Sequence, residues 1–236
     1  STACFWPFSR VANFRKALDM RIDIWSDLIC PWCYIGKRRL EDALSGFEHR
    51  DQVEIVHRSF QLNPSAPAGT TSRRRDILMA KYGWSLAEAE AMDARMEATA
   101  AGDGLEYHLS AVSLTGNTFD AHRLVHLARD RGRQDEAVER LFHAYFTEQR
   151  SLFDHQTLAA LAVEAGLDAD EVKAVLSGDR YADAVKRDLQ EAQALGATGV
   201  PFFVIDRRYG VSGAQPVQVF IGALSRAWAE GPPRTA

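Results

Sequence analysis

Apolar and polar residues alternate around Ile22 and Ile24, which predicts a β-strand directly after Met20. The spacing then becomes helical, with one apolar face formed by Ile35, Leu40, Ala43, Leu44 and Phe47. After a connection at residues 46–52, alternation returns over residues 53–60 and predicts a second strand. A strand, a helix and a strand in this order predict two parallel strands joined by a right-handed crossover.

Helical patterns dominate the middle of the chain. A proline-rich stretch at residues 61–69 leads away from the second strand, and strand patterns are absent from about residue 71 to residue 178. Glycine and aspartate breaks separate the expected helices, which cover residues 72–82, 85–101, 119–131, 134–149, 156–165, 169–176 and 180–195. We therefore expect a helical subdomain inserted into an α/β domain.

The pattern changes again near the C-terminus. Residues 200–205 form a continuous apolar run, which is typical of a strand buried on both faces, and Pro201 suits the start of that strand. A turn at residues 206–208 leads into a short adjacent strand at residues 209–211. We expect the last helix to open at Ser212 and Gly213, with an apolar face formed by Val217, Phe220, Ile221, Leu224 and Trp228.

Composition narrows the class of protein. With 236 residues, of which 46% are hydrophobic and 25% charged, the chain has the length and composition of a globular protein. The formal net charge of -4 gives no reason to expect nucleic acid or an anionic membrane as a partner. No uncharged run approaches the length that spans a bilayer. Three cysteines fit a reducing compartment, so we expect a cytoplasmic protein.

The first nineteen residues fit none of these elements. Their apolar patches are broken by Arg10, Arg15 and Lys16, so they lack the continuous apolar region of a signal peptide. We expect residues 1–19 to be an N-terminal extension, vector-derived or disordered, that the fold does not require. Cys4 would then have no part in the chemistry.

Two cysteines at redox spacing, Cys30 and Cys33, stand where the first strand turns into the first helix. Pro31 suits the first helical position, because its missing N–H is no loss there and its φ is preset. Cys30 then occupies the N-cap, where free N–H groups and the helix dipole favour thiolate over thiol. Cys33 lies one turn inside the helix and should be less exposed. A CxxC in this context indicates a thioredoxin-like redox site, with one cysteine attacking and the other resolving.

Two other roles exist for a CxxC. The spacing also forms half of a zinc site, but the chain has no second CxxC, and His122 and His126 are its one histidine pair at helical spacing. We therefore expect no bound metal, and we interpret the two histidines as surface or interface residues. A purely structural disulfide would close a loop too short to remove much chain entropy.

Three further features have two interpretations each. The arginines at residues 73–75 either meet an anion or form the solvated first turn of a helix, and so short a run favours the second. Asp27 either accepts a proton from Cys33 or caps the turn between strand and helix. Trp32 either lies exposed beside the thiol, where it contacts substrate, or packs on the inserted helices; we expect the first.

The order of elements resembles the DsbA branch of the thioredoxin superfamily. It runs through a strand, Cys30-Pro31-Trp32-Cys33, a helix, a strand, a helical insertion, Gly199-Val200-Pro201, a hairpin and a final helix. Within that branch the chain is most similar to FrnE-like DsbA family oxidoreductases, through the strings at residues 26–36, 60–64 and 117–123. The resemblance covers nearly everything from Met20 to Trp228.

The resemblance implies an α/β, thioredoxin-like fold with a large all-helical insertion. Residues 20–62 and 179–236 would form the two parts of the thioredoxin-like domain, and residues 63–178 the inserted subdomain. Cys30 would be the nucleophile and Cys33 the resolving cysteine. Val200 and Pro201 would form a cis peptide that faces them.

Further implications concern ligands. Pro31 and Trp32 would tune the redox potential and, with Val200 and Pro201, bind substrate. No cofactor is implied to be bound, and the partners would be cysteine-containing proteins or peptides, with glutathione as a redox partner.

Three functions remain open from the sequence. The first is a thiol–disulfide oxidoreductase or isomerase that acts through a mixed disulfide. The second is a glutathione-dependent transferase or 2-hydroxychromene-2-carboxylate isomerase, relatives that typically have serine where Cys30 stands. The third is a non-catalytic, chaperone-like binding module that uses the groove beside Trp32 and Pro201.

Overall fold

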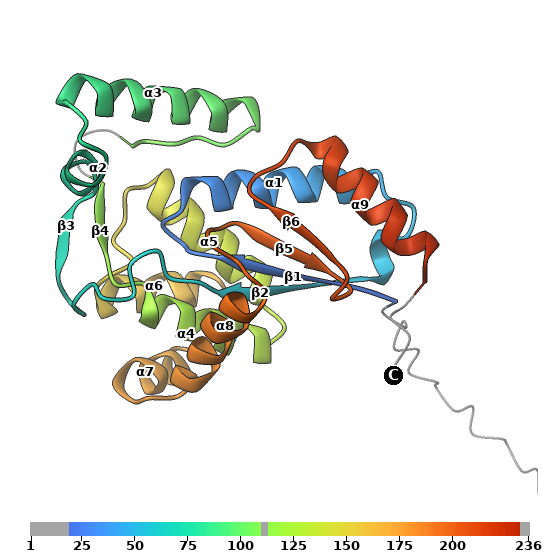
Figure 1. Ribbon diagram of the computed structural model, residues 1–236. Coiled ribbons are helices and arrows are strands. Elements are labelled where there is room, and N and C mark those ends of the chain that lie inside the picture. Colours follow the sequence, from blue (N-terminus) through green and yellow to red (C-terminus); the bar gives the residue numbers. More distant parts are fainter. Residues whose placement is uncertain (1–18, 110–112, 232–236) are drawn as a thin grey trace, which may run out of the picture.

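The computed structural model describes residues 19–109 and 113–231 (Figure 1). The expectation for the N-terminal extension falls on residues 1–18, which lie outside the described residues, as does Cys4. Among the described residues, no helix has both the length and the apolar composition needed to cross a membrane.

A mixed β-sheet forms the centre of the molecule. Its order is β2-β1-β5-β6, with bounds β1 (Met20–Ser26), β2 (Val53–Ser59), β5 (Phe202–Ile205) and β6 (Tyr209–Ser212). β1 and β2 are parallel, as the strand–helix–strand pattern predicted, and β1–β5 and β5–β6 are antiparallel. The chain therefore crosses over once at its start and returns by a hairpin at its end.

Helices cover both faces of this sheet. Because side chains alternate along a strand, Ile22 and Ile24 of β1 face one side and pack with α1 (Pro31–Ser45) and α9 (Val217–Ala229). Trp25 faces the other side, where α8 (Ala182–Ala194) packs, and its indole N–H donates to the Asp188 carbonyl at 2.9 Å. β1 is thus buried on both faces.

A 3-10 turn, η1 (Arg50–Gln52), precedes β2. The remaining elements lie in the inserted segment. Between β2 and α8 the chain forms β3 (Thr71–Arg73), α2 (Arg74–Tyr82), α3 (Leu86–Gly102), β4 (Leu114–Gly116), α4 (Phe119–Asp130), α5 (Gln134–Phe146), α6 (His155–Glu164) and α7 (Ala169–Ser177). Figure 1 shows α3 as the outermost helix, separated from α1 by the segment that follows it.

Two expectations about secondary structure were wrong. Strand is present between residues 71 and 178, because β3 and β4 pair antiparallel from Thr71–Gly116 to Arg73–Leu114. Strands this short carry too few alternating positions to be seen in the sequence. The last helix begins at Val217, after Pro216, and not at Ser212, which is still paired in β6 with Phe202.

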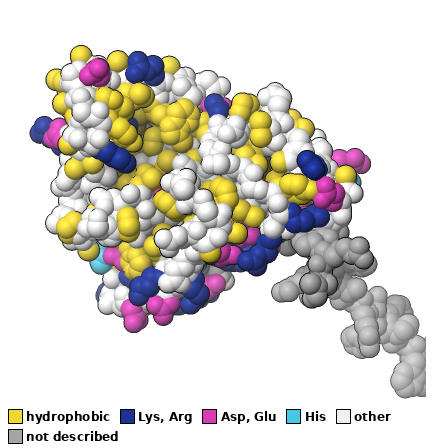
Figure 2. Space-filling view, in the orientation of Figure 1, with side chains coloured by type: hydrophobic (Ala, Val, Ile, Leu, Met, Phe, Trp, Pro, Cys, Tyr) yellow, Lys and Arg dark blue, Asp and Glu magenta, His cyan; other side chains and the backbone are white. Residues whose placement is uncertain are grey.

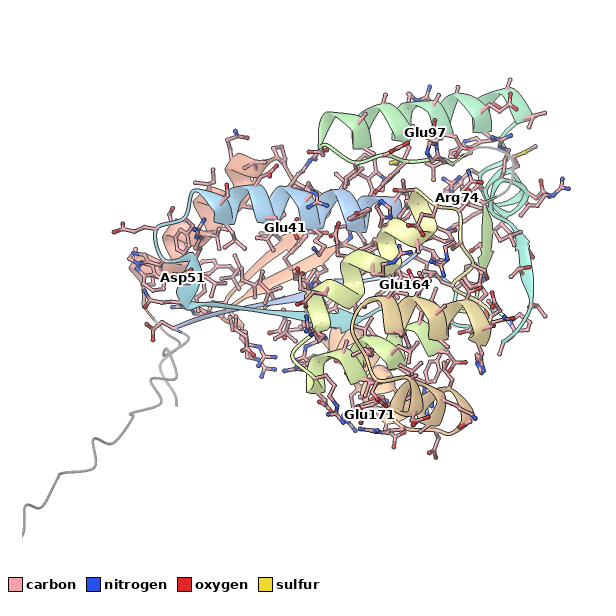
Figure 3. The ribbon with its side chains drawn as sticks, turned by 180° about the vertical axis from the view of Figure 1, so that it is seen from behind. Glu41, Asp51, Arg74, Glu97, Glu164 and Glu171 are labelled. Atoms are coloured by element: carbon pink, nitrogen blue, oxygen red, sulfur yellow. The ribbon has the colours of Figure 1, made fainter. Side chains whose placement is uncertain are left out.

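Of the arginines at residues 73–75, Arg73 is exposed, whereas Arg74 and Arg75 meet a carboxylate and do not form the solvated turn that we expected. Arg74 donates to Asp93 of α3 at 2.6 Å, and Arg75 reaches the other oxygen of the same carboxylate at 3.2 Å. Figure 3 shows Arg74 at the start of α2, below α3, and Glu97 on the side of α3 that faces the rest of the molecule. Glu97 accepts a hydrogen bond from the Leu109 backbone at 2.6 Å. These charged contacts hold α3 over the body of the protein.

Candidate active site

The turn between β1 and α1 places the two cysteines. Cys30 is the N-cap of α1 and Pro31 is the first helical residue, as the sequence predicted. The Cys30 backbone N–H donates to the Asp27 carbonyl at 3.0 Å, and the Cys33 N–H donates to the Cys30 carbonyl at 3.0 Å. The backbone therefore fixes both sulfur-bearing residues within one helical turn.

The two thiols differ in their surroundings. In the described chain both are free, and Cys30 is 5% exposed whereas Cys33 is 1% exposed. Burial raises the pKa of the Cys33 thiol well above its ordinary value, and a hydrogen bond with Cys30 raises it further. Cys33 is therefore held as a neutral thiol until an acceptor for its proton is available.

A segment distant in sequence faces Cys30. The Sγ atom of Cys30 lies 3.6 Å from the carbonyl oxygen of Val200, and the peptide bond between Val200 and Pro201 is cis. Pro201 also packs against α1 at Gly36. The fold thus brings together Cys30, Cys33, Val200 and Pro201, the residues that the resemblance assigned to one site.

An apolar surface borders the site. Trp32 is 42% exposed, as expected, and Leu62, which follows β2, is 50% exposed. Ile77 of α2 and Leu86 of α3 are also exposed. Figure 2 shows hydrophobic side chains gathered around a hollow in the region of α2, α3 and the start of α1. Such a surface suits an extended polypeptide with apolar side chains.

Tyr107 belongs to the site although no sequence pattern indicated it. Its hydroxyl donates to the Pro31 carbonyl at 2.8 Å, inside the CxxC turn. Its ring stacks on Phe146 of α5, with centroids 4.5 Å apart, and against Tyr34 of α1 at 6.1 Å. Burial raises the pKa of Tyr107, and negative charge on Cys30 raises it further. A residue that follows α3 thereby contacts the redox turn directly.

Asp27 lies below the cysteines and is fully buried. Its Oδ2 accepts a hydrogen bond from the Leu62 backbone at 2.7 Å, so its side chain does not cap the first turn of α1. Its other oxygen, Oδ1, has no hydrogen-bond partner among the described residues. The pKa of Cys33 is raised mainly by burial and by contact with Cys30, and the charge of Asp27 makes a smaller contribution in the same direction. A carboxylate is therefore close enough to the buried thiol to influence its ionisation.

His122 and His126 are not surface residues, contrary to expectation. They are 2% and 7% exposed, because α4 is covered by α5, α7 and α8. His122 Nε2 lies 3.6 Å from Asp27 Oδ1, next to the redox turn. His126 Nε2 lies 3.0 Å from Asp188 Oδ2 and 3.2 Å from Ser59 Oγ. A triad would use opposite ring nitrogens, so Ser59, His126 and Asp188 do not form one.

No group of three or more His, Cys, Asp or Glu side chains in the described residues has an arrangement that would hold a metal ion. The polar and reactive groups gathered at this site are the two thiols, the Val200 carbonyl, the Tyr107 hydroxyl, the buried Asp27 carboxylate and the His122 imidazole.

Comparison with known proteins agrees with this geometry. Residues 21–225 match the family described as DSBA-like thioredoxin domain, and the chain belongs to that family. A probable DsbA oxidoreductase from Streptomyces coelicolor, SCO1869, is similar in sequence and structure, with 51% identity over 92% of this chain and 93% of that one and a TM-score of 0.87. The uncharacterized protein YwbO of Bacillus subtilis is 28% identical over 88% of this chain and 97% of its own length.

More distant structures share the fold. A 2-hydroxychromene-2-carboxylate isomerase is 15% identical, with a TM-score of 0.67 over 89% of this chain and 97% of that one. The thioredoxin-like fold with a helical insertion is thus confirmed. At this identity the isomerase match concerns the fold alone.

Proposed function

We propose that this protein is a thiol–disulfide oxidoreductase that acts on cysteines of proteins or peptides through a Cys30 mixed disulfide. One observation carries the proposal: the N-cap thiol of Cys30 faces the Val200 carbonyl, with the buried thiol of Cys33 one turn behind it. The helix end favours the Cys30 thiolate, and the thiolate is the form that attacks disulfides.

The proposed reaction has two exchange steps. The Cys30 thiolate attacks a substrate disulfide, forms a Cys30–substrate disulfide and releases the first substrate thiolate. Cys33 then loses its proton and attacks Cys30 Sγ, which forms the Cys30–Cys33 disulfide and releases the second substrate thiolate. The second step is intramolecular and has a high effective concentration, because the two cysteines share one helical turn.

Two groups of the site assist these steps. Asp27 accepts the proton of Cys33, because it is the buried carboxylate whose charge acts on that thiol. The cis peptide at Val200 and Pro201 presents backbone groups beside Cys30, and Pro31 and Trp32 border the same opening. An extended substrate is bound there through its backbone, while its apolar side chains contact Trp32.

We further propose glutathione as the redox partner and the cytoplasm as the place of action. This choice is supported by DsbM, a cytosolic disulfide reductase from Pseudomonas aeruginosa whose structure was solved with GSH. The DsbM structure has a TM-score of 0.60 and 17% identity, over 87% of this chain and 98% of that one.

The test is a turnover assay with a disulfide-bonded model protein and reduced glutathione. Wild-type protein is expected to accelerate reduction, and Cys30→Ser to be inactive. Cys33→Ser is expected to accumulate covalent adducts with substrate or glutathione, visible by mass spectrometry, because the mixed disulfide is no longer resolved. If both variants keep full activity in a glutathione-transfer assay and no adduct forms, the transferase or isomerase function replaces this proposal. Substrate binding that survives Cys30→Ser without turnover in the wild type would indicate a binding module.

The direction of the reaction follows from the reduction potential. Related dithiol proteins range from about −270 mV for reductants to about −120 mV for strong oxidants. Equilibration of the Cys30–Cys33 pair with glutathione buffers of known ratio, followed by quantification of free thiols, distinguishes a reductase from an oxidase or an isomerase.

A further inference from the structure

Two buried polar atoms without hydrogen-bond partners in the described structure face each other below the redox turn. They are Oδ1 of Asp27 and Nε2 of His122, and they are 3.6 Å apart. The two side chains are 1% and 3% exposed, respectively. A distance of 3.6 Å is longer than a hydrogen bond, so neither atom is satisfied by the other in this arrangement.

The rest of the fold holds this pair in place. The Leu62 N–H binds Asp27 Oδ2 and so directs Oδ1 away from the loop that follows β2. His122 lies in the first turns of α4, where its backbone N–H donates to the Thr118 carbonyl at 3.0 Å. Leaving a buried polar group without a hydrogen-bond partner costs stability. The coincidence of two such groups at one point, beside a reactive thiol, indicates a role in catalysis.

The nearby Cys33 supplies the reason for such a pair. Burial raises the pKa of this thiol, and contact with Cys30 raises it further. Resolution of a mixed disulfide nevertheless requires the Cys33 thiolate. A proton leaving a site that is 1% exposed needs an acceptor inside the protein. The charge of Asp27 acts on the Cys33 thiol. Nε2 of His122 lies 3.6 Å from the unpaired Oδ1 of Asp27.

We propose that His122 is a positioning residue that shares with Asp27 the proton released by Cys33 during resolution. This inference rests on the proposed function and deepens it. The Cys33 S–H bond breaks and its proton passes to the Asp27–His122 pair, where it bridges Oδ1 and Nε2. The Cys33 thiolate attacks Cys30 Sγ, the Cys30–substrate bond breaks with its electron pair on the substrate sulfur, and the substrate leaves as a thiolate. When the protein instead oxidises a substrate, the substrate thiolate attacks Cys30 and expels Cys33 as a thiolate. The Asp27–His122 pair then returns the proton to Cys33.

The resolving step includes the loss of a proton from Cys33, so we expect its rate to depend on pH. Among the described residues, the titratable and charged groups near the pair include Cys33 of α1, Arg74 of α2, Tyr145 of α5 and His126 one turn along α4. Burial raises the pKa of Tyr145, so it stays neutral, although the nearby charge of Arg74 opposes the shift and that of Asp27 adds to it. His126 is engaged by Asp188 of α8 at 3.0 Å.

The experiment separates the two exchange steps with Ellman's reagent, an aromatic disulfide that releases a coloured thiolate. The reduced protein is mixed in stopped flow with one equivalent of reagent, in a Cys4→Ser background. The first coloured thiolate reports attack by Cys30, and the second reports resolution by Cys33. His122→Gln is expected to keep the first phase and to slow the second by on the order of tenfold at pH 7. The inflection of the second phase with pH is expected to differ from that of the wild-type protein.

A matched control comes from the same helix. His126→Gln removes an equally buried histidine one turn away, and it is expected to change the second phase and its pH profile little. Asp27→Asn is expected to slow the second phase at least as much as His122→Gln, because it removes the group that faces Cys33. Thermal melting of each variant establishes that it is folded.

The outcomes are distinguishable. An unchanged second phase and pH profile in His122→Gln overturn the inference about His122 while leaving the oxidoreductase function in place. A rate lowered equally at every pH, with the inflection retained, also overturns it, because that result indicates a structural role only. Absence of any second phase in the wild-type protein contradicts the proposed function itself.

Discussion

Gly36 of α1 lies so close to Pro201 that a Cβ atom at position 36 would approach the proline Cγ to 2.9 Å and Phe203 Cζ to 3.1 Å. The helix that carries both cysteines is therefore packed directly on the segment whose carbonyl faces Cys30. Only glycine allows this approach without displacement of the proline.

Gly36→Ala is expected to move Pro201 and Val200 away from Cys30 and to slow disulfide exchange. Overpacking of this kind costs about 1–3 kcal/mol, which exceeds the roughly 1 kcal/mol that alanine contributes to a helix interior. Gly222→Ala in α9 is the control, because nothing lies within 4 Å of its added Cβ. The control is expected to raise the melting temperature, whereas Gly36→Ala lowers it. Equal stabilisation by both substitutions would show that the contact at Gly36 does not restrict the site.

Cys30 is expected to react before Cys33 with iodoacetamide. Cys30 is the more exposed of the two thiols and lies at the N-cap of α1, whereas burial and contact with Cys30 raise the pKa of Cys33. Quantitative mass spectrometry of peptides from a Cys4→Ser variant, labelled for short times between pH 6 and 8, gives the two rates. Faster labelling of Cys33 at any of these pH values would contradict the assignment of nucleophile and resolving cysteine.

Tyr107→Phe is expected to change the reactivity of the redox turn and not only its stability. The substitution removes the hydrogen bond to the Pro31 carbonyl and retains ring stacking on Phe146, so it should cost about 1 kcal/mol, or roughly 2–4 °C in melting temperature. Tyr145→Phe is the control, because Tyr145 also donates to a backbone carbonyl, that of Leu114 at 2.6 Å. Both variants should lose similar stability, and only Tyr107→Phe should alter the rate of Cys30 alkylation. If the two variants are alkylated at the same rate, Tyr107 is a structural residue.

Asp188 links α8 to the sheet and should make stability dependent on pH. Its carboxylate accepts from Arg58 at 2.9 Å and from the Ser59 N–H at 2.9 Å. Burial opposes ionisation, but hydrogen bonds from His126 and the Ser59 N–H outweigh it and lower the pKa of Asp188. A folded-state pKa below the unfolded value of about 3.9 contributes stability above that value. The contribution is lost as the pH falls through the folded pKa.

Asp188→Asn is expected to lower the free energy of unfolding by about 3 kcal/mol at pH 7, because His126 loses its buried anion and Arg58 keeps only Asp23 of its two buried carboxylate partners. Urea unfolding of wild type and variant between pH 7 and pH 3 measures the difference. The gap should narrow as the pH falls below the unfolded value of about 3.9 and through the lower folded-state pKa of Asp188. A gap that is constant across this range would show that packing, and not charge, determines the effect.

The sequence alone determined the local features of the site. Pro31 and the apolar spacing after it set the start of α1, and that start places Cys30 at the N-cap and Cys33 one turn inside. These features depend on residues within a few positions of one another, and helix-start rules act over that distance. The parallel pairing of β1 with β2 followed in the same way, because a strand–helix–strand order leaves little choice of topology.

Resemblance added the long-range pairing of Cys30 with Val200 and Pro201, which spacing could not supply. Neither route indicated that His122 is buried behind Asp27, that Tyr107 binds the Pro31 carbonyl or that Gly36 abuts Pro201. A histidine on an amphipathic helix looks the same in sequence whether its face meets solvent or another layer. The tertiary structure alone decided which side chains surround the two thiols. It packs His122 of α4 against Asp27 and Tyr107, after α3, against Pro31. Sequence patterns could not predict these contacts, because each joins residues separated by seventy positions or more.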